Sequence, residues 1–483
     1  MTNSHYKSIA YLILISLCIT QSVYLFIKFY EFSWENIDDL LTLTLVDQEN
    51  IDDLITALSS GVNAFPPLYF LSAYLLVSIL NFPNEILLWA HIPFLWISVV
   101  LTYKLFRSFT NWKIASFSTV SIATLKSAFL TQSIYVRPYC LYYCASLATT
   151  LAAINFQKKQ SKLNFLLYWT AFQVITHTHY YGLPIGMLVS LPLLFTDLSN
   201  KKKWMAFIVT LTPTCFSYAY FLPKQLNYLF FAGTTGKTNF INIVSYYQAL
   251  SFSAILVFGV FLFLSFCDKE KISPKKNVPI SLVLLGTSPL IIITSLSFFS
   301  TEGTYFRYFI PAQVGIVGIA IWAVTLIRPL TISKNSSLWL LVISFLLLVT
   351  WSIRNFSNKE LSFEKNYPGS LEFDHSKIND SRIPFFTSHL ETFLKIIHRT
   401  DWPMNSYLLR TDGDDFIELP KFNKMLTPSS KKDLAKLEQF IYHYYYSGPH
   451  SNIDFNPKVW AKENGYSIME INHYPVVLRF TRI

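Results

Sequence analysis

Long apolar runs separated by short polar loops make up most of the first 354 residues. A helix needs ~20 mostly apolar residues to cross the hydrocarbon core of a bilayer. Eleven runs of suitable length predict membrane-spanning helices, at residues 8–30, 86–106, 114–133, 138–156, 163–178, 181–197, 204–222, 241–267, 278–299, 305–328 and 337–354. This pattern is typical of an all-α polytopic membrane protein.

The basic residues between these runs predict the orientation. Cytoplasmic loops of membrane proteins are enriched in Lys and Arg. Five short loops carry such residues, at 104–113, 158–162, 201–203, 269–276 and 328–334. Placing all five in the cytoplasm gives a consistent alternation from residue 86 onward and a cytoplasmic amino terminus. A further apolar run, residues 65–82, then has no room to cross, and we expect it to form a juxtamembrane helix in the outer interface.

Beyond residue 354 charged residues return and the apolar positions become periodic. The spacing predicts amphipathic helices at 388–399 and 430–446 and short strands at 404–409 and 474–482. We therefore expect two domains. Residues 1–354 form the membrane domain, including an acidic outer loop with its juxtamembrane helix at 31–85. Residues 355–483 form a small α/β domain on the extracytoplasmic side.

Composition agrees with a membrane location. The chain is 52% hydrophobic and 14% charged, whereas soluble domains carry roughly 25% charged residues. The net charge of +10 comes from loops expected beside an anionic leaflet, so it does not indicate nucleic-acid binding. The five cysteines lie in or beside apolar runs without metal-ligand spacing. P-loop, Rossmann and HExxH motifs are absent, so we expect no nucleotide or other cofactor.

One interruption of the apolar pattern is acidic. Residues 31–63 contain eight Asp and Glu residues and neither Lys nor Arg, and the sequence Glu-Asn-Ile-Asp-Asp-Leu occurs there twice. A carboxylate at the outer surface can act as a general base that takes a proton from an acceptor hydroxyl. Asp38 and Asp39 are therefore candidate catalytic residues, with Asp52 in the second copy as a competitor. Alternatively, the Asn and Asp residues cap two short helices.

Other polar residues gather at the predicted outer ends of later spans. Arg137 precedes Pro138 and has the forked guanidinium group that suits a phosphate, although an interfacial arginine can also simply reach the headgroups. His177 and His179 are two residues apart and face different sides of a helix, which argues against a two-histidine metal site. His179 can serve a polar ligand or the structure alone. Arg307 opens a further span on the same side.

These residues resemble the motifs of the multispanning GT-C glycosyltransferases that use polyprenyl-phosphate sugars. More narrowly, they are similar to the bacterial branch of the protein-mannosyltransferases and aminoarabinose transferases, which is like glycosyltransferase family 39. In that family an acidic pair in the first outer loop precedes a His-Pro-Pro-Leu-Tyr-Tyr helix. Asp38-Asp39 and the sequence Phe-Pro-Pro-Leu-Tyr-Phe at 65–70 occupy these places. Three further family motifs match Arg137, Tyr139, Thr178, His179, Tyr180, Gly182, Arg307, Tyr308 and Pro311.

The resemblance implies an inverting transferase in a bacterial inner membrane. It would move a sugar from a polyprenyl-phosphate carrier to a lipid, glycan or protein acceptor on the outer face. Asp38 would be the base, with Asp39 as its acidic neighbour. The donor would be bound by His91, Arg137, Tyr139, His179, Tyr180, Arg307 and Tyr308. Because Arg and His can neutralise the phosphate, no metal is required, and the sequence leaves a divalent metal open.

Three positions depart from the family pattern. Phe65 replaces the motif histidine, His91 stands where an arginine is expected, and Ile134-Tyr135 replaces a Gln-Glu pair. These changes are compatible with a divergent donor or with an inactive relative. A lipid or sugar transporter or flippase is the alternative from another class, although such proteins usually show internal repeats and acidic residues at mid-membrane. A non-catalytic membrane scaffold is a third reading.

Overall fold

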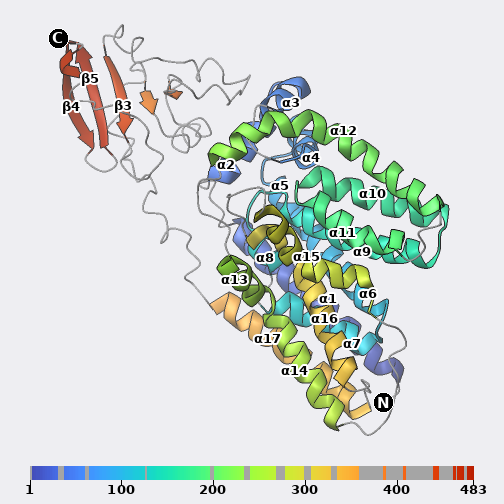
Figure 1. The fold of residues 1–483 in the computed structure, drawn as a ribbon. Helices are drawn as coiled ribbons and strands as arrows, with labels where there is room; N and C mark the ends of the chain where they lie inside the picture. Colours follow the sequence, from blue (N-terminus) through green and yellow to red (C-terminus); the bar gives the residue numbers. More distant parts are fainter. Residues whose placement is uncertain are drawn as a thin grey trace.

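The computed structural model of the chain is dominated by helices. It describes residues 3–30, 37–59, 65–125, 128–195, 201–232, 240–267, 278–297, 306–327, 334–357, 385–387, 406–408, 439–444, 461–463, 465–472 and 476–482. The helices lie in the part of the chain up to residue 357, and a small β-sheet follows in the carboxyl-terminal part (Figure 1).

In the first half of the helical part, the described residues between the long helices α1 and α6 form four short helices and one π-helical turn. The elements of this half are α1 (Asn3–Tyr30), α2 (Ile37–Val46), α3 (Ile51–Ser59), α4 (Leu68–Tyr74), the π-helical turn η1 (Leu75–Ile79), α5 (Ile86–Trp89), α6 (His91–Arg107), α7 (Trp112–Thr124), α8 (Ala128–Ser133) and α9 (Tyr139–Lys158). Asn81, which follows the C-cap residue Leu80 of η1, has a φ of 55°. Asparagine tolerates this left-handed conformation, which ends the helix there.

The second half runs through α10 (Lys162–Thr178), α11 (Gly182–Phe195), α12 (Lys201–Ala232), α13 (Phe240–Leu250), α14 (Phe252–Cys267), α15 (Ile280–Ser297), the 3₁₀ turn η2 (Phe306–Phe309), α16 (Ala312–Ile327) and α17 (Lys334–Ser357). Several predicted spans are therefore divided. The apolar run 241–267 becomes α13 and α14, and the run 114–133 becomes α7 and α8. Hydropathy detects the apolar run but not the turn inside it.

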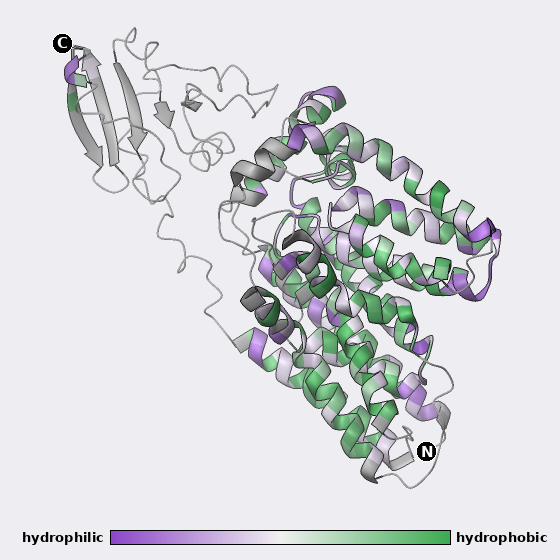
Figure 2. Cartoon of the chain, in the orientation of Figure 1, coloured by the Kyte–Doolittle hydropathy of each residue, from purple (hydrophilic) through white to green (hydrophobic). Residues whose placement is uncertain are grey.

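Apolar residues cover most of these helices (Figure 2). Among the described residues, four helical stretches are long and apolar enough to cross a membrane: Ser4–Tyr30, Ile86–Arg107, Lys201–Gln225 and Ser336–Phe356. Shorter apolar stretches occur at Leu68–Ile79, Gly182–Phe195, Phe252–Ser265, Ile280–Ser295 and Ala312–Leu326. The chain is an integral membrane protein. The number of eleven crossings and the interfacial position of 65–82 stay predictions.

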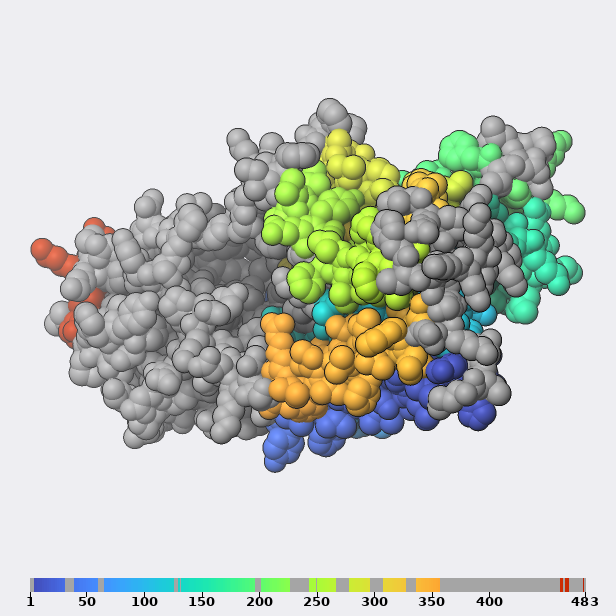
Figure 3. Space-filling view, turned by 90° about the horizontal axis from the view of Figure 1, so that it is seen from below, coloured from blue at the N-terminus to red at the C-terminus, as the bar shows by residue number. Residues whose placement is uncertain are grey.

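Helix packing depends on close contacts between helices far apart in sequence. Helix α17 lies alongside α1 (Figure 3), where the rings of Tyr24 and Trp351 meet edge to face at 5.6 Å. Helices α15 and α16 approach through glycines. A Cβ atom on Gly315 would lie 2.1 Å from the backbone nitrogen of Gly286. Only glycine at this position permits the observed contact, as is common between membrane helices.

The carboxyl-terminal part contains a five-stranded sheet with the order β2-β1-β3-β5-β4. Its strands are β1 (Phe385–Thr387), β2 (Ser406–Leu408), β3 (Gln439–Tyr444), β4 (Tyr466–Asn472) and β5 (Val476–Arg482). Strand β1 is parallel to β2 and β3, whereas β5 is antiparallel to β3 and β4. The sheet is thus a mixed one.

The strands predicted at 404–409 and 474–482 are confirmed by β2 and β5. The helix predicted at 430–446 is wrong where the structure describes it, because residues 439–444 form β3 and pair with β5 along their length. The aromatic and β-branched residues of this stretch favour a strand over the helix that their spacing also allows. The helix predicted at 388–399 lies outside the described residues.

Candidate active site

Helix α2 holds the loop that precedes α9. Asp39 is 0% exposed, and its Oδ1 accepts a hydrogen bond of 2.8 Å from the backbone nitrogen of Val136. One turn along the same helix, Thr42 Oγ1 donates to the Val136 carbonyl oxygen at 2.9 Å. Residues three apart share a helix face, so one face of α2 binds both polar groups of Val136. This contact positions Arg137, the next residue.

Asp38 lies in the first turn of α2, beside Asp39 in the sequence. Its side chain is outside the described part of the structure. The corresponding pair in the second copy has a local role. The backbone nitrogen of Asp53 donates to Asn50 Oδ1 at 2.9 Å, and Asn50 Nδ2 donates to Asp53 Oδ2 at 2.8 Å. This reciprocal pair resembles a capping box at the start of α3, while Asp52 is exposed.

Phe65 lies at the centre of a group of buried rings and charges. Its ring is 5.0 Å from that of His179 and 6.1 Å from that of Tyr139, both edge to face. The guanidinium carbon of Arg137 lies 5.7 Å from the centre of the Phe65 ring, within the range of a cation–π contact. Phe65 therefore packs beneath a charged group at the position where the family motif has a histidine.

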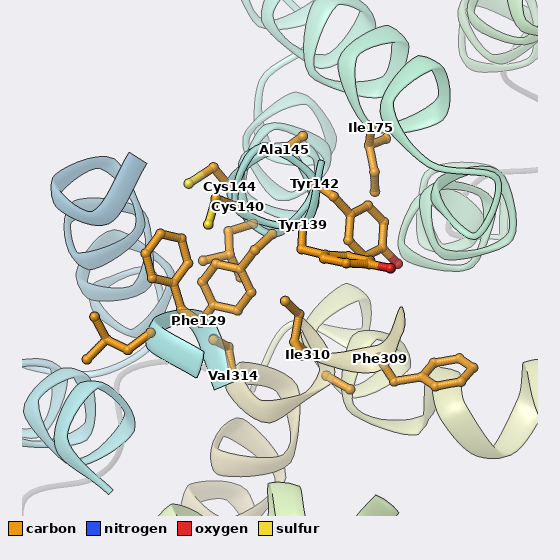
Figure 4. Packing of buried hydrophobic residues seen from close by; sticks show 14 of the residues in the cluster. Phe129, Tyr139, Cys140, Tyr142, Cys144, Ala145, Ile175, Phe309, Ile310 and Val314 are labelled. Carbon is orange, nitrogen blue, oxygen red and sulfur yellow. The ribbon is translucent and has the colours of Figure 1, made fainter. Parts of the chain in front are cut away.

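Arg307 and Tyr308 reach the same group from η2. The guanidinium carbon of Arg307 lies 5.4 Å from the Tyr139 ring, and the Tyr308 ring lies 4.9 Å from His179. Tyr142 attaches η2 to α9, because its hydroxyl donates to the Tyr308 carbonyl at 2.8 Å. Figure 4 shows Tyr139 and Tyr142 on the side of α9 that faces η2. We call this set the Phe65 cluster: Phe65, Arg137, Tyr139, His179, Arg307 and Tyr308.

The protonation state of His179 follows from its contacts. Its Nδ1 is 3.1 Å from the backbone N–H of Tyr181, which can only donate, so the proton of the neutral ring resides on Nε2. Burial, and secondly the charge of Arg307, lower the pKa of His179 to about 3, and the ring is neutral at pH 7. Nε2 is buried without a hydrogen-bond partner among the described residues. His179 thus presents an N–H donor suitable for a ligand.

Tyr69, on α4, is a further buried polar residue near the Phe65 cluster. The sequence Phe-Pro-Pro-Leu-Tyr-Phe at 65–70 includes it, but the sequence analysis assigned it no role. Its hydroxyl is buried and has no hydrogen-bond partner in the described part of the chain. Burial is the main cause that raises the pKa of this hydroxyl; Asp39 raises it further and Arg137 lowers it. Tyr69 therefore lies within electrostatic reach of both α2 and the Phe65 cluster.

Two expected donor-binding residues are engaged elsewhere. Nδ1 of His91 is 2.7 Å from the carbonyl oxygen of Ser133, which only accepts, so the remaining nitrogen of a neutral His91 is an acceptor and not the donor that a phosphate needs. The hydroxyl of Tyr180 donates to Oε1 of Gln225 on α12. Gln225 is fully buried, and the sequence analysis did not single it out.

Among the described residues, no group of three or more His, Cys, Asp or Glu side chains is arranged to hold a metal ion. The cationic groups in the Phe65 cluster are instead Arg137 and Arg307. An arginine can offer two parallel N–H donors to one phosphate. The arrangement therefore suits an anionic ligand that is bound by guanidinium and imidazole groups.

No protein-family model matches the chain, and no curated protein matches it by sequence. Solved structures do share its fold. ArnT from Cupriavidus metallidurans bound to undecaprenyl phosphate aligns with a TM-score of 0.58 and 10% identity, over 98% of this chain and 98% of that chain. The apo state of ArnT from the same organism aligns with a TM-score of 0.51 and 11% identity, over 86% and 87% of the two chains. The chain therefore has a fold similar to that of ArnT.

Proposed function

We propose that the chain is an inverting glycosyltransferase that uses a polyprenyl-phosphate sugar as donor. The observation that carries this proposal is the Phe65 cluster. Arg137, Arg307 and the N–H donor of His179 are gathered there next to α2, the helix with the first acidic pair. Two guanidinium groups and a neutral N–H donor suit a phosphate ester. The fold supports the proposal, because a structure of ArnT contains undecaprenyl phosphate.

The donor phosphate would be bound by Arg137 and Arg307, which balance its charge, and by His179 and Tyr69, which donate hydrogen bonds. Both donors are buried and lack a partner among the described residues. A buried donor without a partner costs about 1–3 kcal/mol, and a bound phosphate would remove this cost. Tyr139 and Tyr308 surround the site with rings that exclude water.

In the proposed reaction Asp38 accepts the proton of an acceptor hydroxyl. The hydroxyl oxygen forms a bond to the anomeric carbon as the bond from that carbon to the phosphate oxygen breaks. The phosphate retains the electron pair and leaves as polyprenyl phosphate, so no general acid is needed. Attack opposite the leaving group inverts the anomeric centre. Asp39 accepts a hydrogen bond from the backbone N–H of Val136. This favours Asp38 as the base and gives Asp39 a positioning role.

We further propose that this reaction takes place on the outer face of a bacterial inner membrane. Eleven crossings with a cytoplasmic amino terminus would place the Phe65 cluster and the domain at 355–483 on that side. The acceptor would be a lipid, a glycan or a protein. The carboxyl-terminal sheet is a candidate element for recognising it.

The test is a transfer assay with the purified protein in detergent, a panel of radiolabelled polyprenyl-phosphate sugars, and a membrane extract as acceptor. Transfer by the parent and its loss in Asp38→Asn would support both the activity and the base. Transfer that survives in Asp38→Asn would move the base to another acid such as Asp52. No transfer with any donor, together with lipid movement across vesicle membranes, would replace the proposal with a flippase.

A further inference from the structure

A buried glutamine on α12 connects three segments that are distant in sequence. Nε2 of Gln225 donates to the Leu58 carbonyl at 2.6 Å and lies 3.4 Å from the Phe65 carbonyl, while its Oε1 accepts the hydrogen bond of the Tyr180 hydroxyl. We call these contacts the Gln225 bridge. Figure 1 shows α12 passing over α3, which ends at Ser59.

The chemistry of the partners leaves one orientation for this amide. The carbonyl oxygens of Leu58 and Phe65 can only accept, so the NH₂ group must face them. The carbonyl oxygen of Gln225 must then face Tyr180, whose hydroxyl donates. The side chain is 0% exposed, so removing it would take one hydrogen bond from each of these partners in a buried place.

A second set of polar contacts joins α10 to α12 and does not involve Gln225. Gln173 Nε2 donates to the Thr210 carbonyl at 2.6 Å, and the hydroxyls of Thr176 and Thr214 are 3.1 Å apart. The Tyr218 hydroxyl donates to the Thr176 carbonyl at 2.8 Å. These contacts join the two helices over several turns, and they are separate from the hydrogen bonds of the Gln225 bridge.

We propose that Gln225 is a positioning residue of the transferase, acting through the Phe65 backbone and the Tyr180 side chain. Phe65 contacts both Arg137 and His179 through its ring, and Tyr180 follows His179 directly. The bridge therefore fixes the position of Phe65 and of the segment His179–Tyr180, whose histidine carries the N–H donor of the cluster. This inference rests on the proposed function. It adds Gln225 as a residue that influences the reaction without touching the donor or the acceptor.

The experiment compares Gln225→Met with the matched control Gln173→Met. Methionine keeps the length of glutamine and removes its hydrogen bonds. Gln173 joins α10 to α12 and has no hydrogen bond to Leu58, Phe65 or Tyr180 among the described residues. A misplacement of about 1 Å can lower a rate on the order of a hundredfold. We expect Gln225→Met to lower kcat/KM for the donor by such a factor with the acceptor KM unchanged, and Gln173→Met to retain the parent value. Both should unfold at lower temperature than the parent.

The milder variant Tyr180→Phe guards against a Gln225→Met protein that does not fold. It leaves the bonds to Leu58 and Phe65 in place, so it should lose less donor kcat/KM than Gln225→Met, and the double variant should lose less than the product of the two factors. Unchanged donor kinetics in both single variants, or an equal loss in Gln173→Met, would overturn the inference. Binding of polyprenyl phosphate gives a separate readout: a parent that neither binds nor transfers overturns the proposed function itself.

Discussion

The sequence Glu-Asn-Ile-Asp-Asp-Leu leads into both α2 and α3, and its two copies have different partners. In the second copy Asp53 pairs with its own Asn50 at the start of α3. In the first copy the equivalent residue, Asp39, is buried and accepts a hydrogen bond from Val136, 97 residues away. Identical residues therefore serve a local cap in one helix and a long-range contact in the other. The difference shows that packing, and not the local motif, decides what each carboxylate does.

The largest expected effect separates Asp38 from its equivalent Asp52. General base catalysis contributes about 10²–10⁴-fold to a rate, so Asp38→Asn should lower kcat by a factor in this range. Asp52 is exposed on α3, and Asp52→Asn should transfer sugar at the parent rate. The measurement is kcat with saturating donor and acceptor for both variants and the parent. An equal loss of kcat in the two variants would show that the two copies do not differ in function.

A smaller effect is expected on stability at the next position of each copy. Asp39→Ala leaves the buried N–H of Val136 without its acceptor, which costs about 1–3 kcal/mol. Asp53→Ala removes one exposed hydrogen bond, and such surface changes are usually within about 0.5 kcal/mol. Thermal unfolding of the two variants in detergent measures the difference.

Asp39→Asn is the control for charge, because an asparagine Oδ1 still accepts from Val136. It should unfold close to the parent temperature and retain more activity than Asp38→Asn. An Asp39→Asn protein with parent stability and no transfer would identify Asp39 as the base and contradict its positioning role.

The comparison also indicates how far the sequence alone can predict this protein. Apolar runs and basic loops predicted a polytopic helical chain, and the chain shares its fold with ArnT. The loops and the motifs also predicted that Arg137, His179 and Arg307 would lie on one side. In the structure Arg137 and His179 contact Phe65, and Arg307 lies over the neighbouring Tyr139 ring. Their roles in binding stay predictions. Motifs of this kind carry such information because residues at the same end of packed helices lie close together.

Other contacts of the site cannot be predicted from the sequence. The partner of Asp39 is a backbone N–H, which every residue except proline has. Gln225 lies just beyond the apolar run 204–222, next to Lys224, like any polar residue at the end of a span, and its partners Leu58 and Phe65 are 167 and 160 residues away. Such contacts depend on how α12 packs across α3, and only the folded structure contains that information.

Thr42 allows the α2 contact to be tested without changing a charge. Thr42→Val keeps the shape of the side chain and removes the donor to the Val136 carbonyl, a change worth about 1 kcal/mol. α3 has a matched position, since Thr56 is the equivalent residue fourteen positions later and is only half-buried. We expect a lower unfolding temperature for Thr42→Val than for Thr56→Val, with donor KM raised only in the former. Equal donor KM values in the two variants would show that the contact between α2 and Val136 does not influence donor binding.

The last prediction concerns the dependence of kcat/KM on pH, where we expect almost no change near pH 6.5. This measurement distinguishes a carboxylate base in the first copy from a histidine base. Burial and the charge of Arg307 lower the pKa of His179 from 6.5 to about 3, so its ring stays neutral across the range from pH 6 to 8 (roughly the physiological window). The parent and Asp52→Asn should therefore show no titration step in kcat/KM near pH 6.5. Below that pH the unfolded chain binds a proton at this position and the folded chain does not, so the unfolding temperature should fall as the pH drops toward 3. A step near 6.5 that disappears in His179→Asn would make His179 the titrating group and remove the first acidic copy from the chemistry.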